Sequence, residues 1–226
     1  MQTNETASVL SRFPLFKSLN AEAVNRLAER AEIIKRPKFN FIYHFDDPSD
    51  RFYIIVEGIV KTGLHSDDGR EIIKNVLHKG AMFGELGIVG EKNRAEFARA
   101  MNQNVVCIAI KTDDLRSVMM QDMSLGFSIL DKIGQRLRRA EAKLEALIFK
   151  DARERIIDFI RNTAADRGRR VGFEMMFKHC LTQQDIANLT GTSRQTVTSV
   201  LNELRKENKI YFNRRSILIR DMEGLA

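Results

Sequence analysis

The sequence predicts an α+β protein in three parts: an N-terminal jelly-roll of the double-stranded β-helix type, one long helix, and a C-terminal domain of short helices with a β-hairpin. Short apolar runs separated by turn residues fill residues 33–110, which is typical of antiparallel strands. A helical heptad pattern follows within residues 122–150. Two short amphipathic helices and two alternating strands lie in residues 151–226. We therefore place the three parts at residues 1–121, 122–150 and 151–226.

Two helical stretches precede the strands. The first covers residues 8–16, and the second, Ala21–Arg30, follows Asn20 as its N-cap. Turn residues then recur about every ten positions, and Asp68-Gly69 is the clearest hairpin turn. We expect the resulting roll to enclose a cavity or to be filled by its own side chains.

The long helix is the next element. We expect Thr112 to cap a short helix that runs to Met120, and Asp122 or Ser124 to open the long helix, which ends near Phe149. Its apolar side chains recur at alternating steps of three and four residues: Leu130, Ile133, Leu137, Ala140, Leu144 and Leu147. This spacing predicts the seam of a parallel homodimer.

The alternative for this seam is that it packs on the chain's own β-roll. Charged side chains are expected to keep the other faces of the helix in solvent: Arg136, Arg138, Arg139, Glu141, Lys143 and Glu145.

The C-terminal part begins with Asp151 as the expected cap of a helix over residues 152–163. We expect three of its arginines to point outward: Arg153, Arg155 and Arg161. A polar loop over residues 165–172 and a strand over residues 173–179 lead to the next helices.

Residues 181–204 predict two short helices joined by a tight turn. Thr182 with Asp185 forms a capping box, Gly191 ends the first helix, and Ser193 caps the second. The second helix has an apolar stripe for the core: Val197, Val200, Leu201 and Leu204. This arrangement is typical of a helix-turn-helix, whose second helix presents its outer face to the DNA major groove. That face carries Arg194, Gln195, Thr198 and Ser199.

Residues 209–212 and 216–220 alternate as strands around Asn213-Arg214-Arg215, which gives a small basic hairpin after the second helix. A helix-turn-helix followed by such a hairpin is a winged helix, so we expect double-stranded DNA as a partner. The alternatives are an ordinary helical hairpin and a ligand-binding module that acts through protein contacts.

Composition narrows the function further. The net charge of +7 is compatible with a polyanionic partner. Cys107 and Cys180 are the only cysteines, which excludes a disulfide framework and a four-cysteine iron–sulfur cluster. Each of the four histidines lies in an expected strand or turn, where a surface or core position explains it, so we do not expect haem. No metal site is expected. The sequence contains no HExxH, GxSxG, Walker or CxxC motif, so we expect no enzymatic activity. Without a signal peptide or a membrane span, we expect a cytoplasmic protein that has no membrane partner.

Two motifs carry a resemblance to a known family. Gly84-Glu85-Leu86-Gly87, followed by Arg94 and Ala95, resembles the phosphate-binding cassette of cyclic-nucleotide-binding domains. Residues 192–197, Thr-Ser-Arg-Gln-Thr-Val, resemble the start of the recognition helix in the CRP/FNR family of bacterial transcription regulators. The order of the three parts is similar to that family over nearly the whole chain. The resemblance implies a dimeric, sequence-specific DNA-binding regulator that is controlled by a small effector at the β-roll or dimer interface and has RNA polymerase as a further partner.

The resemblance assigns the effector site to Gly84, Glu85, Leu86, Arg94 and Ala95. Arg94 would hold a phosphate and Glu85 a ribose hydroxyl, roles that suit a guanidinium and a carboxylate. The cassette is one residue shorter than in cyclic-AMP-binding members, and Ala95 replaces a hydroxyl residue. Ala140 and Glu141 replace the two residues that reach the base. A cyclic nucleotide, another small molecule, or no effector therefore all stay open, as does an ion pair between Glu85 and Arg94 that only fastens the roll.

The resemblance also assigns DNA contacts. Bases of a palindromic operator would be read by Arg194, Gln195 and Ser199, and phosphates would be held by Thr182, Gln184, Ser193 and Thr196. Gln195 and Ser199 stand where some members have Glu and Arg, so we expect a different half-site.

Overall fold

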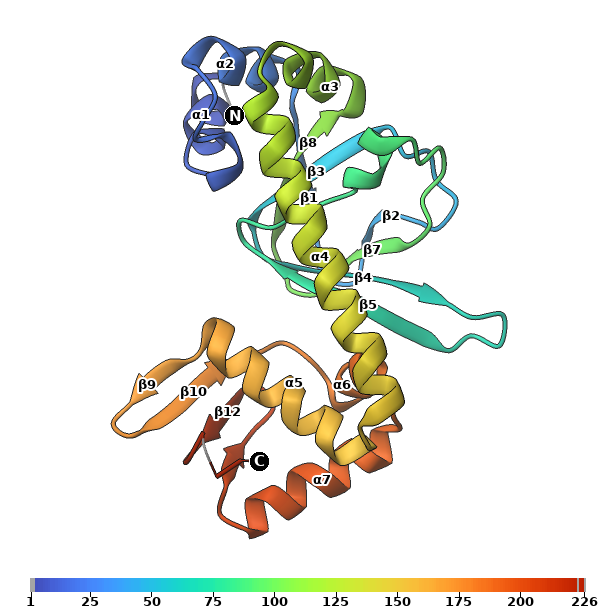
Figure 1. Ribbon diagram of the computed structural model, residues 1–226, viewed down its shortest axis with the longest axis vertical. Coiled ribbons are helices and arrows are strands. Elements are labelled where there is room, and N and C mark those ends of the chain that lie inside the picture. Colours follow the sequence, from blue (N-terminus) through green and yellow to red (C-terminus); the bar gives the residue numbers. More distant parts are fainter. Residues whose placement is uncertain (1–2, 223, 226) are drawn as a thin grey trace. The chain divides into compact units, whose positions relative to one another are not determined.

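The computed structural model describes residues 3–222 and 224–225, whose contacts divide into two compact units (Figure 1). The first unit comprises Met1–Asp68 and Lys74–Arg138, and the second comprises Gly69–Ile73 and Arg139–Ala226. The division falls inside the long helix α4 (Met123–Phe149). The proposed three-part division of the chain places a boundary at each end of this helix instead, and stays a prediction.

Two four-stranded sheets form the roll. One has the order β1 (Glu32–Arg36), β8 (Val105–Lys111), β3 (Arg51–Glu57) and β6 (Met82–Phe83). The other has the order β2 (Phe41–Tyr43), β7 (Phe97–Ala100), β4 (Ile59–His65) and β5 (Glu71–His78). The predicted turn at Asp68-Gly69 joins β4 to β5, and Gly69 has a φ of +80°, which glycine adopts without strain.

The roll is filled largely by its own side chains. Tyr53 and Phe83 stack with ring centroids 4.9 Å apart, and Tyr43 lies beside both. Ile55, Val60 and Cys107 are buried in the same cluster. Side chains therefore pack together inside the roll, as one of the two expectations has it.

Short helices cover the outer side of the β1–β8–β3 sheet. These are α1 (Thr3–Leu10), the 3-10 helix η1 (Pro14–Phe16), α2 (Ala21–Arg30) and α3 (Thr112–Gln121). Their apolar faces form one cluster with Phe52, Ile108 and Ile110. The Asn20 cap of α2 is confirmed, because its side chain accepts a hydrogen bond of 2.8 Å from the Ala23 amide.

Two predicted boundaries in this region are wrong. The first helix is α1, which begins before residue 8 and ends at Leu10, and a separate 3-10 helix, η1, begins at Pro14. Thr112 is the first residue of α3, and Lys111 precedes the helix at the cap position. The Thr112 hydroxyl donates to the Asp50 carbonyl at 3.2 Å instead of capping α3.

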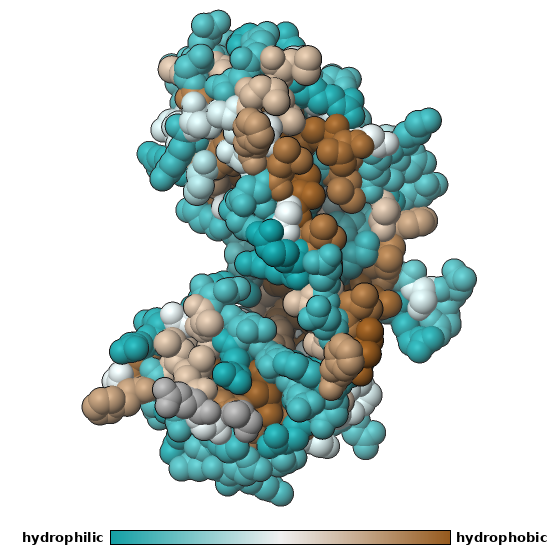
Figure 2. Space-filling model, in the orientation of Figure 1, coloured by the Kyte–Doolittle hydropathy of each residue, from teal (hydrophilic) through white to brown (hydrophobic). Residues whose placement is uncertain are grey.

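Helix α4 has one face in the core and one without a partner. Its start is confirmed, since the Asp122 side chain accepts from the Ser124 amide at 3.0 Å. Leu125 and Ile129 are buried in the core cluster, and Ile133 packs against it. The other large residues of the predicted seam are exposed in the single chain: Leu130, Leu137, Leu144 and Leu147. Hydrophobic side chains are visible over this helix in Figure 2. Of the large apolar residues in the predicted seam, only Ile133 packs on the chain's own first unit, as the alternative for the seam would require.

Besides the end of α4 and the start of β5, the described residues of the second unit contain three helices and one sheet. The helices are α5 (Ala152–Arg167), α6 (Gln183–Thr190) and α7 (Arg194–Lys206). The sheet has the order β11 (Ile210–Phe212), β12 (Ser216–Ile219), β10 (Glu174–Lys178) and β9 (Arg169–Val171). The predicted wing is confirmed as β11 paired with β12.

The predicted loop over residues 165–172 is wrong. Helix α5 continues to Arg167, and the residues after it form β9, which pairs with β10. Cys180 lies after β10 and outside any strand, whereas Cys107 lies inside β8. Across residues 3–222 and 224–225, no helix is long and apolar enough to span a membrane.

Candidate DNA-binding and effector sites

The predicted capping residues bound the two helices of the helix-turn-helix, α6 and α7. The Thr182 hydroxyl accepts from the Asp185 amide at 3.1 Å, and the Asp185 carboxylate accepts from the Thr182 amide at 2.9 Å. Gly191 ends α6 with a φ of +63° in the left-handed region. Ser193 then accepts from the Thr196 amide at 3.0 Å and starts α7. Because each helix start is fixed by bonds between residues three apart, the sequence alone locates both helices.

Helix α7 separates an inner apolar face from an outer polar face. All four predicted core residues are buried: Val197, Val200, Leu201 and Leu204. Arg194, Gln195 and Ser199 are exposed on the opposite side and lie together over the first two turns. A guanidinium and a carboxamide at this place have the donor patterns that read guanine and adenine edges.

The remaining predicted DNA contacts also hold the domain together. The Thr198 hydroxyl lies 2.7 Å from the Gln183 side-chain oxygen and 2.9 Å from the Arg194 carbonyl, so it ties α7 to α6. The hydroxyls of Ser193 and Thr196 lie 2.8 Å apart. Gln184 is exposed and donates to the Asn188 side chain at 2.8 Å.

The wing is fastened at its tip. The Asn213 side chain accepts from the amides of Arg215 and Ser216 at 2.8 and 2.9 Å. The amide of His179, just after β10, donates to the Arg215 carbonyl at 2.8 Å. Arg214 and Arg215 are exposed there, so the tip presents two cations.

Glu85 opens the short helix η2 (Glu85–Val89) after Gly84, whose φ is +74°. Its carboxylate is only 4% exposed and pairs with Arg136 of α4, which also donates to the Met82 carbonyl. The second carboxylate oxygen of Glu85 is buried and has no hydrogen-bond partner. One acceptor of the cassette therefore stays unsatisfied.

Arg94 is 2% exposed and donates to main-chain carbonyls, at 3.1 Å to Gly84 and also to Arg51. Its guanidinium carbon lies 4.4 Å from the centre of the Tyr43 ring, a cation–π contact. Nε has no partner. The alternative of a Glu85–Arg94 ion pair is wrong, because Glu85 pairs with Arg136, while the nearest carboxylate of Arg94 is Glu91 at 3.9 Å.

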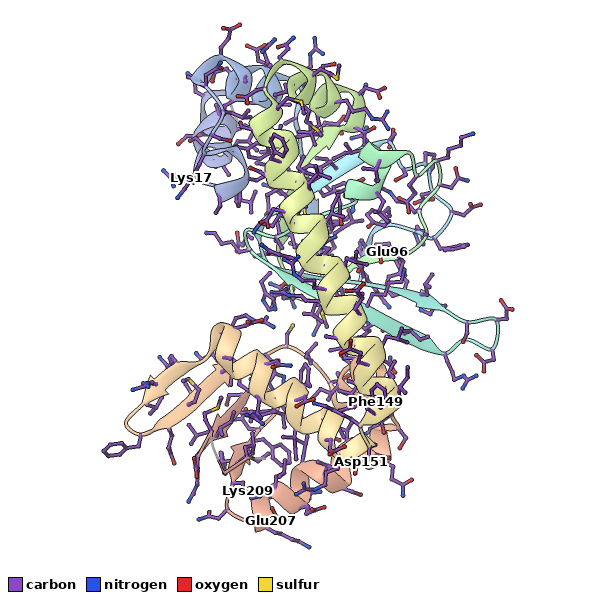
Figure 3. All side chains as sticks on the ribbon, in the orientation of Figure 1. Lys17, Glu96, Phe149, Asp151, Glu207 and Lys209 are labelled. Carbon is purple, nitrogen blue, oxygen red and sulfur yellow. The ribbon has the colours of Figure 1, made fainter. Side chains whose placement is uncertain are left out.

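Other groups set the charge around the cassette. Glu96, labelled in Figure 3, lies 3.5 Å from Lys74, and burial raises the pKa of its carboxyl despite that cation. The Ala95 amide donates to Glu91 at 3.1 Å, and the Leu86 side chain is exposed. Two carboxylates, Glu85 and Glu96, therefore offset the cations at this site.

Sequence reasoning placed two important arginines in solvent, and the structure corrects both. Arg136 lies three residues after Ile133, so it continues the face of α4 that packs on the roll, a spacing that could have revealed its role. Arg155 donates to three carbonyls from the first turn of α5. Lys143 is also half-buried and donates to the Ile73 carbonyl at 3.1 Å.

Within residues 3–222 and 224–225, no group of three His, Cys, Asp or Glu is arranged to hold a metal ion.

Comparison with known proteins agrees with this geometry. Residues 34–122 match the cyclic nucleotide-binding domain, and residues 154–226 match the Crp-like helix-turn-helix domain. A CRP-like cAMP-activated global transcriptional regulator of Mycobacterium tuberculosis is 31% identical over 218 residues, covering 96% of this chain and 97% of that protein. The chain belongs to the CRP/FNR family of transcription regulators. The cAMP-activated global transcriptional regulator CRP of Salmonella typhimurium is 26% identical and covers 83% of this chain and 89% of its own length.

Solved structures show the same fold. FixK2 from Bradyrhizobium japonicum superposes with a TM-score of 0.77 at 23% identity, covering 86% of this chain and 95% of that chain. A CooA mutant from Carboxydothermus hydrogenoformans gives a TM-score of 0.76 at 22% identity, with 87% of each chain covered. CRP/FNR regulators bind DNA and act as dimers. The chain is therefore a DNA-binding transcription regulator with an effector domain, rather than a signalling module that acts only through protein contacts.

Proposed function

We propose that this regulator binds a two-fold symmetric DNA operator as a homodimer and reads each half-site with the exposed start of α7. The observation that carries the proposal is the outer face of α7, where Arg194, Gln195 and Ser199 lie exposed over a fully packed inner face. Arg194 offers a bidentate fork for guanine, and Gln195 suits an adenine edge. In a symmetric dimer the half-sites would lie about 34 to 36 Å apart.

Several groups would hold the DNA backbone in this proposal. The hydroxyls of Thr182, Ser193 and Thr196 and the amide of Gln184 lie at the starts of α6 and α7, where free backbone amides favour phosphate. Thr198 would contribute indirectly, because its hydroxyl already bonds the Gln183 side chain of α6 and so holds α7 in place. The cations at the wing tip would reach flanking phosphates.

The exposed α4 stripe is the proposed dimer seam. Leu130, Leu137 and Leu144 lie at heptad spacing and have more than half of their surface exposed in the single chain. Ala140 between them permits close approach of two helices. The partner of this surface in the proposal is a second copy of the same helix.

The proposed effector is a small anion at the cassette, and cyclic nucleotides are the first to test because named relatives are cAMP-activated. Glu85 and Arg94 each retain one buried polar atom without a partner, which a ligand could satisfy. To hold a phosphate, Arg94 would have to exchange its carbonyl acceptors for phosphate oxygens. Arg94→Leu should then abolish any response of DNA binding to a cyclic nucleotide, measured by gel shift with and without ligand.

The remaining parts of the proposal follow from the family. As a transcription regulator, the protein would work in the cytoplasm, where it would act on RNA polymerase, and would not be an enzyme. Co-purification of polymerase on operator DNA with and without the regulator would test the polymerase contact.

A salt titration tests DNA binding most simply. Each phosphate contact releases counterions, so the affinity for operator DNA should fall steeply between about 50 and 200 mM salt. Arg194→Ala should weaken specific binding, while Arg161→Ala, an exposed arginine on α5, should not. No shift of any DNA fragment at low salt would contradict the proposal.

A further inference from the structure

Arg155 of α5 contacts three main-chain carbonyls at once. Its Nε donates to the Thr190 carbonyl at 2.8 Å, and its two terminal nitrogens donate to Lys150 at 2.7 Å and Gly191 at 3.1 Å. Thr190 and Gly191 form the end of α6 and the turn before α7. Lys150 lies in the joint between Phe149 of α4 and Asp151, which caps α5 (Figure 3).

These acceptors need a partner from outside their own helix. The last carbonyls of a helix have no amide within it to bond, and they lie at the negative end of the helix dipole. The planar guanidinium supplies several donors in a fixed geometry, which a lysine ammonium does not. One side chain therefore fastens the turn of the helix-turn-helix to the end of α4.

A second contact lies at the same place. A Cβ atom built on Gly191 would be 2.8 Å from the Leu147 side chain of α4. The turn thus fits closely against the last turns of α4, with an apolar contact from Leu147 and a polar one from Arg155.

Arg153 makes a different kind of contact two residues earlier. It pairs with Glu203 at 3.0 Å and with Glu207, labelled in Figure 3, at 3.7 Å, both toward the end of α7. All these side chains are at least one-third exposed, so salt screens the pairs. Arg153 is therefore a matched control. It lies in the same turn of α5 as Arg155, but it bonds side chains of α7 instead of the main-chain carbonyls of Thr190 and Gly191.

We propose that Arg155 is a positioning residue that fixes the helix-turn-helix to the end of α4 and so sets the separation of the two recognition helices in the dimer. The proposal rests on the proposed symmetric operator. In a dimer joined through α4, any freedom at the joint with α5 becomes freedom in the distance between the two α7 helices. A fixed distance is what selects one half-site spacing.

The test measures the preference for spacing. Wild-type protein and the variants Arg155→Gln, Arg155→Lys and Arg153→Lys are titrated against a symmetric operator and against operators lengthened or shortened by one or two base pairs. We expect the wild type and Arg153→Lys to prefer one spacing by about ten-fold or more, the scale of one mismatched base pair. Arg155→Gln should bring the preference below about three-fold, and Arg155→Lys should give an intermediate value.

A purely structural role would reduce the active fraction equally for every spacing and leave the ratio of affinities unchanged. An unchanged ratio in Arg155→Gln therefore overturns the proposal, as does a wild type that binds operators of every spacing equally. If Arg155→Gln does not fold, the same ratio in Arg155→Lys decides the question. A wild type that binds no DNA refutes the proposed function itself, which is a different result.

Discussion

Arg136 of α4 forms an ion pair with Glu85, whose carboxylate is almost wholly buried in the cassette. Both residues lie in the first compact unit, and the pair connects the part of α4 in that unit to the proposed effector site. It occupies the carboxylate that the family resemblance assigns to a ligand hydroxyl. An effector that bound Glu85 would have to share this carboxylate with Arg136 or displace it.

Arg136→Ala should destabilise the protein by about 3 kcal/mol, because it leaves a buried carboxylate without its cation. The double variant Glu85→Gln with Arg136→Ala should lose less than the sum of the two single variants. Urea unfolding of all four proteins measures this coupling. Additive losses would show that the pair contributes nothing of its own.

Leu144→Asp should convert the dimer to a monomer, since it places a carboxylate in the apolar seam on both helices. Ala142→Asp puts the same charge on an exposed position of α4 outside the seam and should leave the dimer intact. Sedimentation velocity distinguishes the two states. A dimeric Leu144→Asp protein would place the interface elsewhere.

The thiol of Cys107 should not react in the folded protein at pH 8. Burial raises its pKa from 9.0 to about 12, so almost none is thiolate. Because the folded-state pKa is the higher one, the stability from this neutral thiol is fully present below pH 9 and is lost as pH rises toward 12. Titration with a thiol reagent should count Cys107 only after denaturation, and Cys107→Ser should flatten the alkaline loss of stability.

Gly191→Ala should cost about 1 to 2 kcal/mol, because the left-handed backbone at this turn disfavours a Cβ atom. The new methyl would also press on Leu147. Gly134→Ala, inside α4 and with no neighbour closer than 3.7 Å to the added Cβ, should instead stabilise by a few tenths to about 1 kcal/mol. Thermal unfolding compares them, and equal effects of the two changes would be inconsistent with strain at Gly191.

Local rules explain what could be predicted from the sequence. The caps at Thr182 and Ser193 and the stop at Gly191 depend on bonds within three or four residues, and all of them are present. The apolar stripe of α7 needs only its period of 3.6 residues, and its four members are buried. The heptad spacing likewise located the exposed stripe on α4.

The errors concern contacts between distant residues. The acceptors of Arg136 lie 51 and 54 residues away in the chain, and two of those of Arg155 lie 35 and 36 residues away. Arginine on a helix is ordinarily solvated, so the local pattern favoured solvent for both. The strand β9 pairs with β10, and its three residues, two arginines and a valine, are too few to show a strand period of their own.

Selection of operators from a random DNA pool tests the central claim, that the start of α7 reads a two-fold symmetric site. The wild type should enrich palindromic sequences, and Arg194→Ala should lose its preference at one base pair in each half-site, a change of about 1 to 3 kcal/mol. Arg161→Ala, which alters an exposed arginine of α5, should enrich the same sequences as the wild type. Enriched sequences without two-fold symmetry, or base preferences that Arg194→Ala leaves unchanged, would contradict the account.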